Sequence, residues 1–262
     1  MKTRELRSNV FATYTTLRVG MGVIAFVIPL LLWGGGRTAG HHLQGSICAY
    51  YHTPMRDYFV GAMFAAGVLL YLYKGFSWQE NYALNLAGVL AILIAIVPAD
   101  PPGKLPATPA ESTASVIALS ASAPGDPNVP RSPTGQIHNV LSVAFLLTLA
   151  YVCLFRSADT LQLIGSSVRK NSYYYTYKII GVCMVATPAI VYYIANHSQR
   201  HLSYGERVLI FYVECAAMWA FGIYWMLKTK EISESMADRT TEHARVLPIA
   251  RPAIPVVHAI SR

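Results

Sequence analysis

The chain has 262 residues, of which 54% are hydrophobic and 13% are charged, and its mean hydropathy is +0.38. A soluble domain usually carries about a quarter charged residues, so this composition excludes a single soluble globule. The net charge of +8 is therefore interpreted through membrane topology and anionic lipid headgroups, and nucleic acid is not expected as a partner.

Long apolar runs bounded by charged residues, Pro or Gly predict an all-α polytopic membrane bundle with six transmembrane helices. Helices are expected because an isolated strand cannot satisfy its backbone groups in lipid. The second run is the weakest because it is short, and the three glycines at 34–36 are expected to end the first helix. The predicted spans are 17–33, 59–73, 82–97, 137–155, 173–194 and 208–227.

The distribution of Lys and Arg predicts the orientation of these spans. Fifteen of the 21 basic residues fall on the side that would carry both termini. Because basic residues are enriched in cytoplasmic segments, both termini are expected in the cytoplasm. The protein is expected to be a multi-pass protein of the inner membrane of a bacterium.

Two long segments lie outside the spans of the single six-helix domain expected over 1–227. Residues 98–135 contain nine of the fifteen prolines and predict a flexible outer loop. Residues 228–262 predict a basic cytoplasmic tail that begins as a helix over 228–246. This tail is expected either to lie near anionic lipid or to dock a protein partner.

The candidate functional residues are the polar ones that topology places at membrane depth, because a charge there is costly. Glu214 lies seven residues past Arg207 in the sixth span, about 10 Å below the outer surface at the rise of a helix. Other polar residues are expected to reach the same side of the membrane from separate stretches of the chain. They are His52, Asp57, His138, His197 and His201.

These residue types fit a zinc site. Two histidines four positions apart share one face of a helix, as 197 and 201 would if the fifth helix continues past them. Imidazoles and a carboxylate hold Zn²⁺ with one open position for water. The predicted ligands are His52, His138, His197 and His201, with Asp57 or Glu214 as the base that activates water and Ser46 assisting. The competing interpretation is a solvated rim of polar loops that binds no metal.

Two stretches of sequence resemble a known family. SICAYYHTPMRDYFVGAMFAAGVLLYLYKG and ENYALNLAGVLAILIAIVP are similar to six-helix membrane proteins of the DRAM/FRAG type, with His138 and Glu214 as further suggestive positions. The resemblance covers mainly residues 46–99. It implies a role in membrane-lipid processes and carries over no catalytic residues.

A second resemblance is to the CREST superfamily of membrane hydrolases, whose signature is a Ser, a His, an Asp and a late HxxxH around zinc. The residues that match it in order are Ser46, His52, Asp57, His197 and His201. This resemblance implies a metal-dependent hydrolase. The chain departs from that superfamily in having six predicted helices, where CREST proteins have seven and carry these residues inside their spans.

Three functions therefore stay open from the sequence. The first is an inner-membrane protein that acts through lipid or protein contacts, as a single chain or a homo-oligomer. The second is a zinc-dependent lipid hydrolase with its site in the outer leaflet. The third, a small-molecule transporter, ranks last because it needs polar residues along the whole depth of the bundle, and the inner halves of the spans are expected to offer few.

Overall fold

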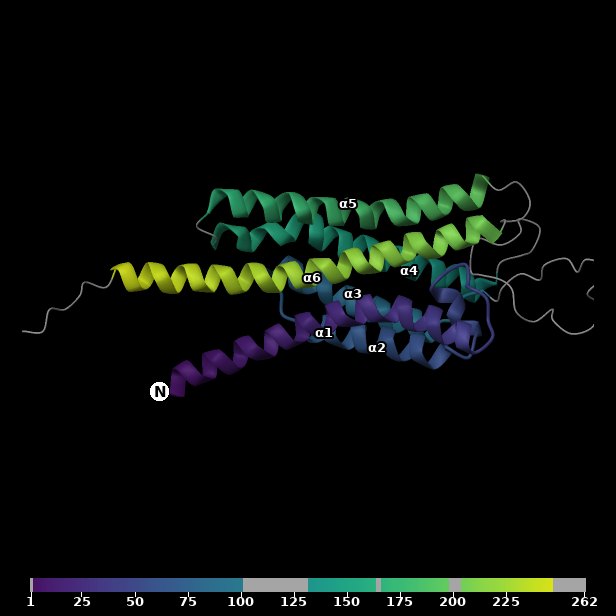
Figure 1. Cartoon of the computed structure of the whole chain (residues 1–262), viewed down its shortest axis with the longest axis horizontal. Coiled ribbons are helices and arrows are strands. Elements are labelled where there is room, and N and C mark those ends of the chain that lie inside the picture. The colour runs from purple at the N-terminus through teal and green to yellow at the C-terminus, as the bar shows by residue number, and fades with distance from the viewer. Residues whose placement is uncertain (1, 101–131, 164–165, 198–203, 247–262) are drawn as a thin grey trace, which may run out of the picture.

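The computed structural model describes residues 2–100, 132–163, 166–197 and 204–246 (Figure 1). All regular structure in this part of the chain is helical, as the sequence predicted. The long helices are α1 (Lys2–Thr38), α2 (Arg56–Leu72), α3 (Trp78–Ile96), α4 (Pro133–Tyr151), α5 (Ser167–His197) and α6 (Tyr204–Val246).

Each predicted span overlaps one of these helices, and five of the helices are long and apolar enough to cross a membrane. The other one, α2, has 17 residues and corresponds to the span that was weakest in the sequence. The predicted loop 98–135 ends earlier than expected, because Ser132 caps α4 and Pro133 opens it. Residues 101–131 of that loop lie outside the described part of the chain.

The first helix does not end at the glycine triplet, which corrects the sequence-based expectation. α1 continues to Thr38, and the turn that follows it is made by Gly40, whose φ is +79°. The Gly40 amide donates to the Arg37 carbonyl at 3.1 Å, and the His41 amide donates to the Gly36 carbonyl at 2.9 Å. This pair of bonds is a Schellman motif, so one later glycine ends the helix.

The glycine triplet instead makes room for the α1–α2 connection. A Cβ added at Gly35 would lie 2.3 Å from the Met55 side chain, and one added at Gly36 would lie 2.9 Å from the Tyr50 ring. Tyr50 is fully buried and Met55 is nearly so. The small residues therefore allow a loop to pack closely against the last turns of α1.

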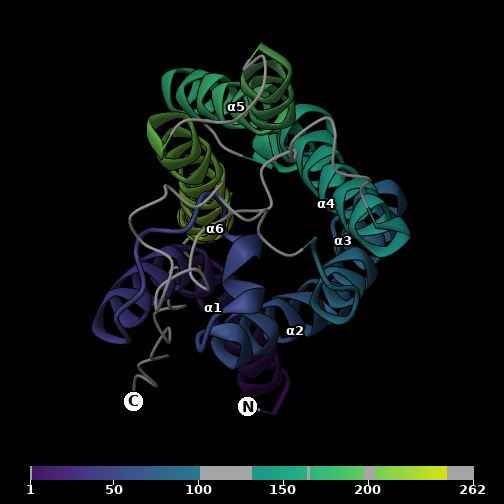
Figure 2. The same cartoon turned by 90° about the vertical axis from the view of Figure 1, so that its right-hand side faces the viewer.

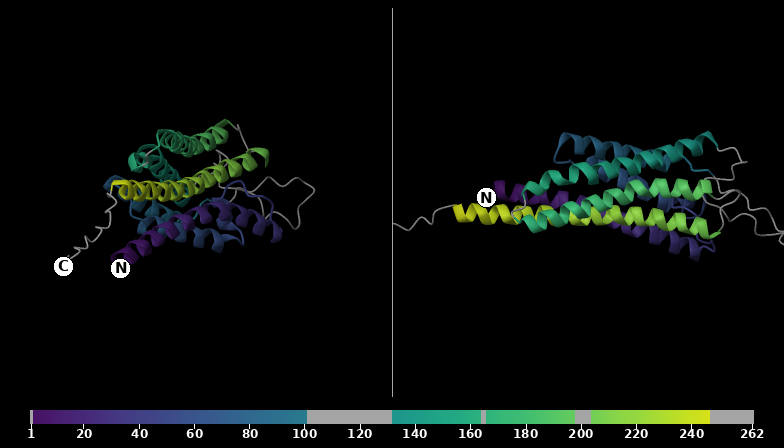
Figure 3. Two further views of the ribbon diagram at one scale, coloured as in Figure 1. Left: turned by 60° about the vertical axis from the view of Figure 1, so that its left-hand side comes forward. Right: turned by 90° about the horizontal axis from the view of Figure 1, so that it is seen from above.

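The six helices form a closed ring in chain order, as the view along the bundle shows (Figure 2). The strong helix–helix contacts are those between consecutive helices, and α6 closes the ring against α1. α1 begins and α6 ends at the same end of the bundle (Figures 1 and 3). We call this the terminal end, and we call the opposite end, where α1 connects to α2, the loop end.

Aromatic side chains gather at two levels on the outside of the ring, as expected where a bilayer has two interfaces. At the loop end the exposed ones are Trp33, Tyr58, Tyr192, Tyr193 and Tyr212. Toward the terminal end they are Tyr71, Phe76, Trp78, Tyr82, Phe155, Tyr174 and Tyr175. The helix surfaces between these two levels are apolar, which is typical of a surface that faces lipid.

The last helix, α6, extends beyond the predicted span 208–227 at the terminal end of the bundle. α6 ends at Val246, where the helix at the start of the tail was predicted to end. However, Lys228, Glu231 and Ser235 are buried, and the apolar segment of α6 continues to Ser235. The expected boundary between domain and tail at 227/228 therefore lies inside the bundle, because the first polar residues after it pair with one another there.

Candidate functional site

The α1–α2 connection folds back into the ring at the loop end. We call residues 44–52 the plug; it contains the short 3-10 helix η1 (Cys48–His52). Ala49 is fully buried in a cluster with Ile210 of α6, against Val191 and Ile194 of α5. The Tyr50 ring lies 6.0 Å from the ring of Phe211, measured between centroids. Figure 2 shows η1 inside the ring, so the plug fills the loop end of the bundle.

Two of the predicted catalytic residues bond to the backbone of this plug, Glu214 from α6 and Ser46 from within the plug itself. The Glu214 carboxylate accepts a hydrogen bond from the Ile47 amide at 2.6 Å, and the Ser46 hydroxyl accepts one from the Ala49 amide at 3.1 Å. Both bonds satisfy backbone N–H groups at the start of η1, which have no partner within the helix itself. Glu214 thus fixes the plug to α6, and Ser46 caps the short helix inside the plug.

Cys48 lies beside the Glu214 carboxylate. Burial raises the pKa of the Cys48 thiol, and the nearby negative charge of Glu214 raises it further. A thiol is nucleophilic only as the thiolate, so this shift disfavours reaction at Cys48.

The predicted histidine ligands in the described residues meet at the end of α3. The Nε2 atom of His52 lies 2.9 Å from the Ala99 carbonyl oxygen, and Nδ1 of His138 lies 2.7 Å from the Val97 carbonyl oxygen. Because a carbonyl only accepts, each facing nitrogen carries the hydrogen. His138 is buried, and within the described residues its Nε2 atom has no hydrogen-bond partner. Asp57 is exposed in the first turn of α2 and makes no contact with these rings that the structure records.

The zinc site stays a prediction. Among the residues that the structure describes, no three His, Cys, Asp or Glu side chains are grouped as the ligands of one metal ion would be. His201 lies outside the described residues, and so does the side chain of His197, which ends α5.

A buried charge network lies at the terminal end, where sequence reasoning expected few polar residues in the spans. Lys228 and Glu231 of α6 form an ion pair of 3.0 Å in which both side chains are at most 1% exposed. Lys228 also donates to the Ser157 carbonyl at 2.8 Å and to the Thr160 hydroxyl at 2.6 Å. Glu231 accepts from the Tyr177 hydroxyl at 2.6 Å and from Thr160. Lys228 and Glu231 lie just past the predicted end of the sixth span at 227, so the bundle contains buried charges that the predicted spans did not include.

A second part of this network lies across the ring. Arg18 of α1 is buried, donates to the Tyr73 hydroxyl at 3.1 Å and lies 5.3 Å from the centre of the Tyr73 ring. Glu80 is buried at the start of α3, where it accepts from the Phe76 amide at 2.8 Å and its own amide donates to Ser77. This reciprocal arrangement resembles a capping box, for which Ser77-x-x-Glu80 was a readable sequence signal.

The sequence gives a weaker indication that Lys228 and Glu231 are buried than it gives for the Ser77–Glu80 cap. It shows only two opposite charges three residues apart at the end of an apolar run. The pair is buried because α6 packs against the connection between α4 and α5. At that connection the chain passes through a π-helical turn (Val152–Arg156) into a 3-10 helix (Ser157–Leu163). The Ser157 carbonyl in this transition accepts from Lys228, and the Leu154 carbonyl accepts from Lys178.

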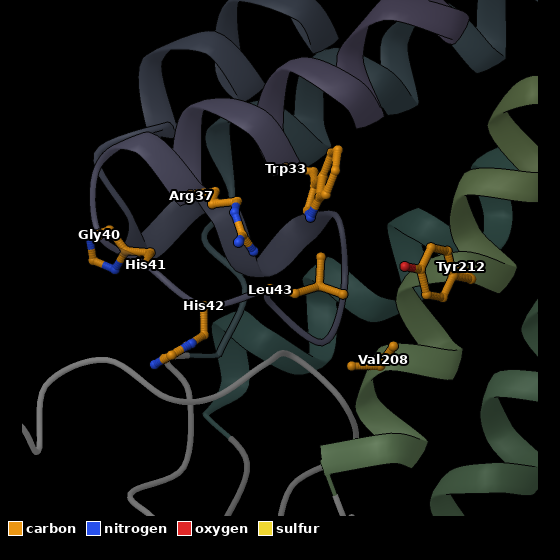
Figure 4. Close-up of a pocket in the computed structure, with 8 residues that line it drawn as sticks. All are labelled: Trp33, Arg37, Gly40, His41, His42, Leu43, Val208 and Tyr212. Carbon is orange, nitrogen blue, oxygen red and sulfur yellow. The ribbon is translucent and has the colours of Figure 1, made fainter.

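A pocket of about 560 Å³ opens at the loop end between the last turn of α1 and the first turns of α6 (Figure 4). Its lining is divided between cationic or ionisable side chains and apolar or aromatic ones. The lining residues are Trp33, Arg37, Gly40, His41, His42, Leu43, Val208 and Tyr212. No site was assigned to His41 and His42 from the sequence.

The pocket lies at the ends of two long apolar helical segments. Arg37 is in the last turn of the apolar helix Asn9–Thr38, and Trp33 lies one turn deeper. Tyr212 lies seven residues into the apolar segment that begins at Gly205, about 10 Å along the helix. Figure 4 shows Arg37 and Trp33 extending from α1 toward the space that Val208 and Tyr212 border from α6.

Comparison of the chain with protein-family models, with curated proteins and with solved structures finds no match. The resemblances to DRAM/FRAG-type and CREST proteins therefore stay predictions from sequence.

Proposed function

We propose that this is a multi-pass membrane protein that acts by binding a membrane lipid at its loop end. The observation that carries the proposal is the pocket between α1 and α6, which is polar on one side and apolar on the other. A lipid presents the same division at the junction of its headgroup and acyl chains. The first of the three functions that the sequence left open was action through lipid or protein contacts, and the proposal names the place where a lipid would bind.

The position of the pocket supports a lipid over a soluble metabolite. It opens where two apolar helices reach the aromatic level of the loop end, with Trp33 and Tyr212 both substantially exposed, at 44% and 55%. Indole and phenol rings favour the interface because one edge is polar and the body is apolar. A lipid that diffuses in the bilayer reaches such a pocket from the side, without leaving the membrane.

The proposal includes a topology. All six helices cross the membrane, α2 being the shortest, both termini are cytoplasmic, and the membrane is a bacterial inner membrane. The excess of basic residues on the terminal side supports this orientation. A reporter fused after Arg262 is expected to read as cytoplasmic, and a periplasmic reading would overturn the orientation.

Lipid binding at the pocket is tested by native mass spectrometry of the purified protein. Wild-type protein is expected to retain one lipid under conditions that remove detergent, and Tyr212→Ala is expected to reduce that occupancy. Tyr58→Ala is the matched control, because Tyr58 is also 55% exposed at the loop end but does not line the pocket. Equal loss in both variants, or no retained lipid in the wild type, would refute the site.

A second candidate is the zinc-dependent lipid hydrolase, with His52, His138, His197 and His201 as ligands. One observation favours it: His52 and His138 each have one ring nitrogen fixed by a backbone carbonyl, as metal-bound histidines usually do. Elemental analysis of the purified protein tests it. Stoichiometric zinc that is lost in the His138→Ala variant would support this candidate, and its absence would remove it.

A further inference from the structure

We propose that the pocket selects a lipid with an anionic phosphate headgroup and that Arg37 is the residue that recognises the phosphate. This inference rests on the proposed lipid-binding function and adds the chemical class of the ligand.

The polar groups that line the pocket are hydrogen-bond donors. Arg37 has a guanidinium group with five N–H donors, Trp33 has an indole N–H, and Tyr212 has a phenolic O–H. Within the described part of the chain none of these three side-chain groups has a hydrogen-bond or ion-pair partner that the structure records. A ligand that satisfies them must be rich in acceptor oxygens, as a phosphodiester or phosphomonoester is.

The charge of the lining favours an anion. Arg37 carries a permanent positive charge, two histidines add ionisable groups, and none of the eight lining residues is acidic. The nearest acidic residues along α6 do not line the pocket. Glu206 has another interaction partner, and Glu214 accepts from the Ile47 amide of the plug.

The polar rim is held in shape before any ligand binds. The Schellman bonds at Gly40 and His41 fix the direction of the chain after α1. The Gln44 side-chain amide donates to the His42 carbonyl at 2.9 Å, which fixes the next turn. A preorganised rim lowers the entropic cost of binding, and a guanidinium pairs with a phosphate through two parallel hydrogen bonds.

The apolar half of the lining distinguishes a lipid from a free phosphate ester. Leu43 and Val208 offer no hydrogen bond and add apolar surface beside the two aromatic rings. A soluble phosphate ester would leave this surface in water, whereas the glycerol backbone and upper acyl chain of a phospholipid would cover it. The pocket therefore fits the whole junction between headgroup and chain.

The test measures which lipid the full-length protein binds. Protein in nanodiscs of dioleoylphosphatidylcholine is titrated with dioleoylphosphatidylglycerol, and bound lipid is counted by native mass spectrometry. Wild-type protein is expected to prefer phosphatidylglycerol, and Arg37→Gln is expected to weaken that binding about tenfold, the range of one charge-assisted hydrogen bond. Binding of phosphatidylcholine is expected to weaken less in the variant, because its headgroup carries the same phosphate but no net charge.

The matched control is Arg56→Gln. Arg56 is another exposed cation at the loop end, but it donates to the Tyr51 hydroxyl at 2.8 Å and does not line the pocket. This variant is expected to keep the wild-type preference. A thermal unfolding curve of each variant verifies that neither substitution has disturbed the bundle.

The outcomes separate this inference from the proposed function. If wild-type protein retains both lipids equally, or if Arg37→Gln keeps the preference, the phosphate inference is wrong and lipid binding stands. If neither lipid is retained, the proposed function is wrong as well. If inorganic phosphate at millimolar concentration displaces phosphatidylglycerol completely, the ligand is a soluble phosphate and the lipid source is refuted.

Discussion

The buried ion pair of α6 gives the sharpest quantitative prediction for this protein, and we develop it for Glu231→Gln. The Glu231 carboxylate is fully buried and accepts hydrogen bonds from Lys228, Tyr177 and Thr160. An amide in its place keeps one acceptor oxygen and turns an N–H₂ group toward partners that are themselves donors. Lys228 then remains as a buried positive charge without its counter-ion.

Removing one partner of a buried ion pair costs about 3–5 kcal/mol, because the other charge is left uncompensated. For a chain of this size, 1 kcal/mol changes the melting temperature by about 2–4 °C. Glu231→Gln is therefore expected to lower the melting temperature by about 6–20 °C. The assay is thermal unfolding of the detergent-solubilised protein, followed by intrinsic fluorescence.

Glu234 provides the matched control, one turn further along α6. It pairs with Arg169 of α5 at 3.4 Å and accepts from the Tyr173 hydroxyl at 3.1 Å, but both charged side chains are partly exposed. Exposed pairs contribute about 0–1 kcal/mol. Glu234→Gln is therefore expected to lower the melting temperature by a few degrees at most.

The double variant Lys228→Met with Glu231→Leu tests the cause of the effect. It removes both charges, so no unpaired charge remains inside the bundle. It is expected to melt above Glu231→Gln. The reasoning would be refuted if Glu231→Gln and Glu234→Gln had equal effects, or if the double variant lost as much as the sum of its two single substitutions.

Two further predictions concern the plug. Glu214→Leu removes the acceptor for the first amide of η1, so Cys48 is expected to react with maleimide at least about tenfold faster, since a lost charge-assisted bond is worth about 1.5–3 kcal/mol; peptide mass spectrometry locates the label. Glu214→Gln also removes the charge beside Cys48 but keeps an acceptor oxygen for the Ile47 amide, so it is expected to react more slowly than Glu214→Leu, and equal rates in the two variants would contradict this role. Gly36→Ala brings a methyl group against the plug, and the overpacking is expected to cost about 1–3 kcal/mol, which lowers the melting temperature by about 2–12 °C. Gly34→Ala, whose added Cβ meets nothing within 4 Å, is expected to leave the melting temperature unchanged or raise it. A result in which Gly34→Ala destabilises more than Gly36→Ala would show that the plug does not pack against α1 in this way.

The sequence by itself determined the helical class and the order of the spans. Shortage of charge and runs of about twenty apolar residues suffice for this, because lipid leaves the backbone no alternative to internal hydrogen bonds. It also contained the helix from 228 to 246 and a capping signal at Ser77 and Glu80. These features depend on residues that are close along the chain, so they can be predicted from the sequence alone.

The tertiary structure decided which polar residues meet and what each one does. Glu214 was readable as a buried carboxylate, but its partner, the Ile47 amide, lies 167 residues away and is reached only because a loop folds into the ring. The glycine triplet was interpreted as a helix end because the residues that Gly35 and Gly36 pack against, Met55 and Tyr50, cannot be inferred from sequence. Likewise, Lys228 and Glu231 are interior residues only because α6 packs against the connection between α4 and α5. Closure of the ring brings distant side chains within hydrogen-bond distance, and burial then determines whether a charge is costly, paired or available to a ligand.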